Sequence, residues 1–137
     1  ENWLRTCLTY AVPPTIVLCV FPANAEYAAV VLVVLAFGDP AAATAGRAWG
    51  RSKLPWNAEK TVVGLVSFVL VAGVMGSVAY WGEARNPHVS FGTAVACGTT
   101  AALLGGLAES LASRVDDNLR ISIAATVGVV TASRLLI

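Results

Sequence analysis

Residues 61–81 read TVVGLVSFVLVAGVMGSVAYW, an apolar run without a single charged side chain. An α-helix needs about 20 such residues to cross the hydrocarbon core of a bilayer, so this stretch predicts a membrane-spanning helix. The whole chain points the same way. Of its 137 residues, 57% are hydrophobic and 12% are charged, whereas soluble domains are about 25% charged. The mean hydropathy is +0.73.

Four further apolar segments accompany this run, at residues 3–21, 25–37, 89–111 and 119–137. We expect a kink or break at Pro13-Pro14 in the first. The segment 25–37 is short for a crossing and can reach full depth by running on into residues 41–46. We therefore predict an all-α, polytopic transmembrane helical bundle of about five spans. A short helix over residues 41–49 lies at its cytoplasmic face, and residues 1–137 form a single integral membrane domain.

Small residues are frequent in these segments. In lipid, helices associate through close packing, which small residues permit, so we expect five glycines at helix contacts: Gly73, Gly76, Gly98, Gly105 and Gly106. The cysteines Cys7, Cys19 and Cys97 also lie in apolar runs, without metal-ligand spacing. They are expected to be small buried side chains and not a disulfide framework.

Basic residues are unevenly distributed over the connections. If the spans alternate, one side of the membrane holds seven of the nine basic residues: Arg5, Arg47, Arg51, Lys53, Lys60, Arg114 and Arg120. The positive-inside rule makes that side cytoplasmic, with the amino terminus inside and the carboxyl terminus outside. The net charge of only +1 argues against a nucleic-acid partner.

Acidic residues converge on the same predicted face. Asp39 ends an apolar run, and Asp116-Asp117-Asn118 separates the last two segments. Two interpretations stay open for each. Asp39 before Pro40 suits the start of a helix, and the 116–118 turn suits a cap of the last helix. Carboxylate and amide oxygens are also ligands for a hard cation such as Mg²⁺.

Glu109 and a group of cations complete the candidate chemistry. Glu109 lies in an otherwise apolar run, where we expect it to face the interior as a functional residue, or to be salt-bridged near the surface. The basic residues between Arg47 and Lys60 either anchor the chain to anionic headgroups or, with Gly46 and Gly50, bind phosphate. Gly50-Arg51-Ser52 is not a Walker A motif. His88 falls on the opposite side and is given no metal role.

The spacing of these residues resembles the polyprenol kinase family, which includes dolichol kinase, phytol and farnesol kinases and the CTP-dependent diacylglycerol kinase. Phosphatidate cytidylyltransferase is a more distant likeness. The resemblance covers roughly residues 34–123. It rests on Gly38-Asp39-Pro40-Ala41-Ala42, Gly46, Gly50, Lys53, Lys60-Thr61, Gly64, Glu109 and Asp117-Asn118. This chain departs from the pattern at Val63, where relatives often have an acidic residue, and we expect it to lack the family's further amino-terminal helices.

The resemblance implies a Mg²⁺-dependent kinase that moves the γ-phosphate of CTP, or of another nucleotide, to the hydroxyl of a lipid alcohol in the bilayer. It implies catalytic roles for Asp39, Glu109 and Asp117, with Asp39, Asp116 and Asp117 at the metal. The implied nucleotide and phosphate ligands are Gly46, Gly50, Arg51, Lys53, Lys60 and Asn118. The alternatives are a phosphatidate cytidylyltransferase-like enzyme, which releases pyrophosphate, and a non-catalytic transporter or membrane subunit.

Overall fold

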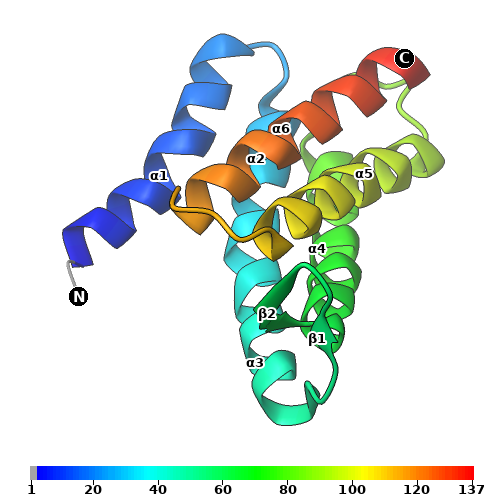
Figure 1. The fold of residues 1–137 in the computed structure, drawn as a ribbon. Coiled ribbons are helices and arrows are strands. Elements are labelled where there is room, and N and C mark those ends of the chain that lie inside the picture. The colour runs from blue at the N-terminus through cyan, green and yellow to red at the C-terminus, as the bar shows by residue number, and fades with distance from the viewer. Residues whose placement is uncertain (1–2) are drawn as a thin grey trace.

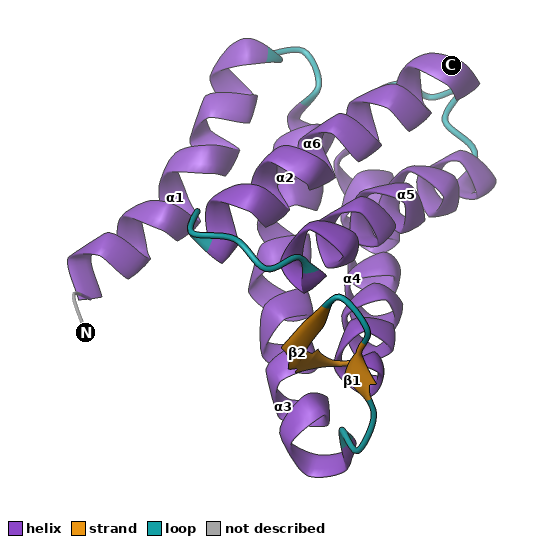
Figure 2. Cartoon of the chain, in the orientation of Figure 1, coloured by secondary structure: helices purple, strands orange, loops and turns teal. Residues whose placement is uncertain are grey.

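The computed structural model describes residues 3–137, apart from the side chain of Arg5. The prediction that Arg5 lies on the cytoplasmic side of the membrane therefore falls outside the described part. The described chain is helical except for one hairpin (Figures 1 and 2). Its elements are α1 (Trp3–Val20), α2 (Ala25–Val33), the π-helix η1 (Val34–Gly38), α3 (Asp39–Trp49), β1 (Lys53–Leu54), β2 (Asn57–Thr61), α4 (Val62–Glu83), α5 (Phe91–Ser110) and α6 (Asp117–Leu136).

The elements α2, η1 and α3 form one helix, Ala25–Trp49. This confirms that the short apolar segment extends past Asp39. The interpretation of Asp39 as the cap of a separate helix is wrong, because the backbone at Gly38 and Asp39 is already helical. Pro40 explains the local geometry. It has no N–H to donate, and its ring crowds the carbonyl of the preceding turn. The π-turn η1 widens the helix just before it.

Four helices in the described chain are long and apolar enough to cross a membrane: Ala25–Trp49, Val62–Glu83, Phe91–Ser110 and Asp117–Leu136. The predicted count of five is not confirmed, because the apolar part of α1, Thr6–Val20, falls short of the roughly 20 residues a crossing needs. Pro13 and Pro14 do not break α1 but lie inside it, and the helix bends along its length (Figure 1).

Small residues form the closest helix contacts of the bundle, and many large apolar residues face outward. A Cβ added to Gly98 of α5 would lie 2.6 Å from the carbonyl carbon of Gly76 on α4, and one added to Gly128 of α6 would lie 2.9 Å from the Cα of Ala101. The outward-facing residues include Leu70, Val74, Val78, Leu103, Leu107, Ile123 and Val127. This arrangement suits helices that pack closely in lipid.

The predicted small residues behave in different ways. Gly76 and Gly98 form the α4–α5 contact as expected, whereas Gly73 has only ordinary neighbours, the nearest at 3.8 Å. Gly105 and Gly106 pack against the ring of Phe68, which is fully buried. Cys97 is buried as predicted. The expected burial of Cys7 and Cys19 is wrong, because both lie on the outward side of α1, and all three thiols are free.

Candidate functional site

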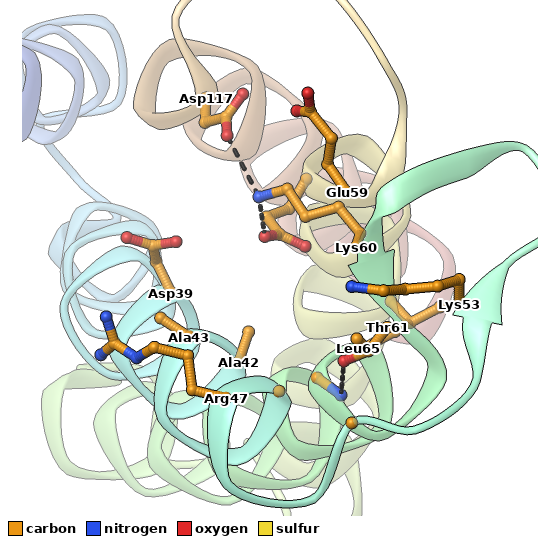
Figure 3. Close-up of a pocket in the computed structure, with 14 residues that line it drawn as sticks. Asp39, Ala42, Ala43, Arg47, Lys53, Glu59, Lys60, Thr61, Leu65 and Asp117 are labelled. Atoms are coloured by element: carbon orange, nitrogen blue, oxygen red, sulfur yellow. Dashed lines mark hydrogen bonds and ion pairs between the residues drawn. The ribbon is translucent and has the colours of Figure 1, made fainter.

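A cavity of about 640 Å³ opens where α3, the hairpin, the start of α4, the end of α5 and the start of α6 meet (Figure 3). Its charged side chains come from four of these elements, which are far apart in sequence. They are Asp39, Arg47, Lys53, Glu59, Lys60, Glu109 and Asp117. The two acidic regions predicted to share one face of the membrane, Asp39 and the 116–118 turn, therefore do meet at one end of the bundle.

One wall of the cavity is a single face of α3. Asp39, Ala43 and Arg47 recur every four residues and line the cavity together (Figure 3), as side chains at this spacing do on one helix face. The π-turn directly before Asp39 sets the rotation of this face. Arg47 belongs to the basic group that the sequence offered for phosphate binding, although the resemblance implied Arg51 as the ligand. Because the helix is uninterrupted, Arg47 lines the cavity and Arg51 does not.

Glycines allow α3 to lie against the hairpin and the start of α4. A Cβ on Gly46 would lie 2.9 Å from Thr61 Oγ1, one on Gly50 would lie 2.6 Å from Thr61 Cγ2, and one on Gly64 would lie 3.1 Å from the Ala42 carbonyl oxygen. The N–H of Gly50 donates to the Gly46 carbonyl at 3.1 Å. Gly46 and Gly50 thus line the cavity and keep it open. The Gly50 N–H already has a hydrogen-bond acceptor in the Gly46 carbonyl.

The antiparallel hairpin of β1 and β2 carries Lys53 and Lys60, where the sequence predicted a plain connection. It is fixed to the end of α5 by two hydrogen bonds. Asn57 Nδ2 donates to the Ser110 carbonyl at 3.1 Å, and Trp56 Nε1 donates to Ser110 Oγ at 3.2 Å. Because Ser110 follows Glu109, these bonds bring Lys60 onto the carboxylate of Glu109.

Lys60 is the centre of an ion-pair network. Its ammonium pairs with Glu109 Oε1 and, at 3.3 Å, with Asp117 Oδ2. Burial acts to lower the pKa of Lys60, but the hydrogen bond that its ammonium donates to Glu109 and the charges of Glu109 and Asp117 outweigh it, so the pKa is raised. Glu109 is only 3% exposed. It faces the interior as predicted, and a salt bridge accounts for its burial.

Arg120 supports this network and was missed among the predicted site residues. Its guanidinium donates to the carbonyls of Ala108 at 2.7 Å and Leu111 at 2.8 Å, and it pairs with Asp117 Oδ1. Arg120 therefore donates to carbonyls at the end of α5, where helical partners run out, and fixes Asp117 beside them. Asp117 and Arg120 are three residues apart, a spacing that places two side chains side by side on a helix, and this was the sequence signal for the pair.

Three predicted site residues do not line the cavity. Asp116 accepts a hydrogen bond from the Asn118 N–H at 3.0 Å and so caps α6. A helix cap was one of the two interpretations that the sequence left open for this turn. The Asn118 amide donates to Thr9 Oγ1 of α1 at 3.0 Å. Arg51 is exposed beyond the end of α3. These residues were predicted to bind the metal or the phosphates, but none of them lines the cavity.

The carboxylates Asp39, Asp116 and Asp117 are the predicted ligands for Mg²⁺. Within residues 3–137, no three acidic, histidine or cysteine side chains group closely enough to hold a metal by themselves, so Asp39, Asp116 and Asp117 do not form a closed site. Asp39 and Asp117 nevertheless line one cavity (Figure 3). Two carboxylates in a roomy cavity fit Mg²⁺, which usually takes one or two carboxylates and completes its shell with phosphate oxygens and water.

No protein-family model, no curated protein and no solved structure matches this chain.

Proposed function

We propose that this protein is a lipid-alcohol kinase, which transfers the γ-phosphate of CTP, or of another nucleoside triphosphate, to the hydroxyl of a prenol or polyprenol in the bilayer. One observation carries the proposal. The residues of the kinase-like pattern are spread over α3, the hairpin, α5 and α6, yet Asp39, Lys53, Lys60, Glu109 and Asp117 line a single cavity. Phosphoryl transfer depends mainly on positioning and charge neutralisation, and a convergent cluster of both signs suits that chemistry.

The phosphates belong at the α3–hairpin side of the cavity. Arg47 and Lys53 line that side, and no carboxylate among the described residues forms an ion pair with either. The α4 helix begins beside them at Val62, so the positive end of its dipole adds to the attraction for an anion. Lys60, held by Glu109 and Asp117, lies at the border between the cations and the carboxylates.

Asp39 and Asp117 are the residues that would hold Mg²⁺, and the ion, when bound, neutralises charge on the transferring phosphate. Glu109 is the proposed group that orients the lipid hydroxyl or accepts its proton, and the Lys60 ammonium fixes its position. The hydroxyl oxygen forms a bond to the γ-phosphorus while the bond to the β–γ bridging oxygen breaks. The products are a lipid phosphate and a nucleoside diphosphate.

A groove beside the cavity suits the lipid tail. It measures about 500 Å³, and its apolar wall is a stripe of Leu4, Leu8 and Val12 on α1 facing Leu119 on α6. Asp116 also lines it, next in sequence to Asp117 of the cavity.

We place the cavity at the cytoplasmic face, where nucleotide is available, with the amino terminus inside. Arg47, Lys53, Lys60 and Arg120 gather at this end of the bundle, and basic residues favour the cytoplasmic side. Cysteine labelling from either side of sealed vesicles, at a residue introduced in the 51–56 turn, tests this orientation.

The activity is tested with purified protein in lipid vesicles, γ-labelled CTP or ATP, and a panel of farnesol, geranylgeraniol, phytol, dolichol and diacylglycerol. Transfer of label to one of these lipids, dependent on Mg²⁺, is the expected result. Label that stays with the nucleotide for every alcohol would contradict it. A cytidylyl lipid with pyrophosphate release would identify cytidylyltransferase chemistry, and failure to bind CTP–Mg²⁺ would favour a transporter or a non-catalytic subunit.

A further inference from the structure

A second polar cavity, of about 360 Å³, lies at the other end of the bundle. Its walls come from the α1–α2 turn and the first turn of α2, from the α4–α5 turn, and from the last turn of α6. In Figure 1 these two turns and the carboxyl terminus lie at the top, opposite the hairpin. The polar and charged residues around it are Asn24, Glu26, Asn86, Ser133 and Arg134. Because the cavity is at the ends of candidate spans, it lies at the level of lipid headgroups.

Glu26 is the unusual member of this cavity. It is 5% exposed, and its Oε1 accepts a hydrogen bond from Asn24 Nδ2 at 2.8 Å. Its Oε2 is also buried but has no hydrogen-bond partner among the described residues. A buried carboxylate oxygen that lacks a donor is costly. Glu26 lines this cavity, and its second carboxylate oxygen has an acceptor site that no described residue fills.

The surrounding groups define the shape of that ligand. Ser133 Oγ is already engaged, since it accepts from the Tyr27 hydroxyl at 2.8 Å and meets the Tyr80 hydroxyl at 2.9 Å. Arg134 is exposed at the rim, and no ion pair joins it to Glu26 in the described part of the chain. The cavity thus has a buried anion, Glu26, and an exposed cation, Arg134, at its rim. This pair matches a ligand whose ammonium enters the cavity while its phosphate stays at the rim.

We propose that this cavity binds the headgroup of a phospholipid with a primary ammonium, with Glu26 receiving the ammonium and Arg134 facing the phosphate. A primary ammonium supplies the N–H donors that Oε2 lacks, and charge-assisted hydrogen bonds of this kind are the strong ones. A trimethylammonium group has no N–H and cannot fill that role. This site is separate from the kinase cavity, and the proposal does not depend on the proposed activity.

The test is lipid retention by the full chain, purified in detergent with equimolar phosphatidylethanolamine and phosphatidylcholine and analysed by native mass spectrometry. We expect phosphatidylethanolamine to be retained about tenfold over phosphatidylcholine. Glu26→Gln keeps the side-chain shape and is expected to abolish the preference. Glu83→Gln, an exposed carboxylate at the same end of the bundle, is the matched control and is expected to keep it. Arg134→Gln should weaken retention of both lipids and leave their ratio unchanged.

Equal retention of the two lipids by the wild-type chain would overturn the proposal without any variant. A preference that survives in Glu26→Gln would also overturn it. Excess soluble phosphoethanolamine distinguishes the sources of the ligand. If it displaces the lipid, the headgroup alone is recognised. If it does not, the acyl chains contribute and the ligand is the intact lipid. Kinase activity of Glu26→Gln is measured in parallel and should equal that of the wild type, which separates this test from that of the kinase cavity.

Discussion

Two glutamates are buried at opposite ends of this bundle, and they are stabilised in different ways. Glu109 is 3% exposed at the end of α5, and Glu26 is 5% exposed at the start of α2. The carboxyl end of a helix disfavours an anion and the amino end favours one. Glu109 lies at the unfavourable end and has Lys60 as its counter-ion. Glu26 lies at the favourable end, and the Asn24 amide is its one side-chain hydrogen-bond donor among the described residues.

The contrast shows what each end is built to hold. At the cavity between α3 and the hairpin the protein supplies its own cation to Glu109, so this carboxylate keeps its position before any ligand arrives. At the opposite cavity the helix dipole lowers the cost of burying Glu26 without occupying its second oxygen. One carboxylate is therefore preorganised by the chain, and the other is left to receive a partner from outside.

The largest effect is expected from removing the internal cation. Lys60→Met leaves Glu109 buried without its counter-ion, and breaking a buried pair in this way costs about 3–5 kcal/mol. The free energy of unfolding in detergent, measured by denaturant titration, should fall by an amount near the lower end, because the Lys60 side chain is 28% exposed. Adding Glu109→Met should recover most of the loss. Lys53→Met, which removes a cation with no ion pair, is the control. An equal loss in both single variants would show that Glu109 does not depend on Lys60.

The next effect concerns the proposed chemistry. Asp39→Asn removes a proposed metal ligand and should lower kinase activity by about a hundredfold or more, with little change in unfolding. Asp116→Asn is the matched control, since Asn caps a helix as well as Asp and Asp116 does not line the cavity. Full activity of Asp39→Asn in vesicles would refute the metal assignment.

A smaller effect tests whether both ends depend on one scaffold. Gly98→Ala places a Cβ 2.6 Å from the Gly76 carbonyl carbon, and overpacking of this kind costs about 1–3 kcal/mol. The melting temperature should fall, and both nucleotide binding and lipid retention should weaken, because α4 and α5 contribute to the first cavity and the turn that joins them contributes to the second. Gly82→Ala has no atom within 4 Å of the new Cβ and should be neutral. A loss confined to one end would show that the two cavities are supported separately.

The sequence predicted the parts of this structure that follow from composition and from order along the chain. Hydropathy placed the four candidate spans, and the alternation of spans brought Asp39 and Asp117 to one end. It did not predict the hairpin. The hairpin is fixed by the hydrogen bonds of Asn57 and Trp56 to Ser110. These bonds span sequence separations of 53 and 54 residues, and no local sequence pattern predicts contacts of that kind.

Three of the predicted site residues, Arg51, Asp116 and Asn118, do not line the cavity. The sequence indicated that the segment could run on past Asp39, but it did not predict the π-turn that sets the face of α3 carrying Arg47. Asp116 suited a metal ligand as well as a cap. Only the position of its carboxylate at the N–H of Asn118 decides between them at this site.

A further prediction uses the raised pKa of Lys60. Because the folded-state pKa is higher than that of the unfolded chain, the stabilisation from this pairing is fully present below the ordinary lysine value of 10.5 and is lost as the pH rises through the folded value. The stability difference between wild type and Lys60→Met should therefore stay constant from neutral pH to about pH 10 and shrink above it. A difference that shrinks between pH 6 and 8 would show that another group controls the network.

The smallest effect is expected at the other glutamate. Glu26→Gln loses a favourable interaction with the start of α2, worth about 0.3–1 kcal/mol, but also removes a buried charge whose second oxygen is unfilled. These changes oppose each other, so unfolding in detergent without added lipid should differ from wild type by less than about 0.5 kcal/mol. With phosphatidylethanolamine present the wild type should become the more stable of the two, because a ligand that binds only the folded state raises its stability. A large loss without lipid would mean that the chain itself satisfies Glu26, and the contrast with Glu109 would then disappear.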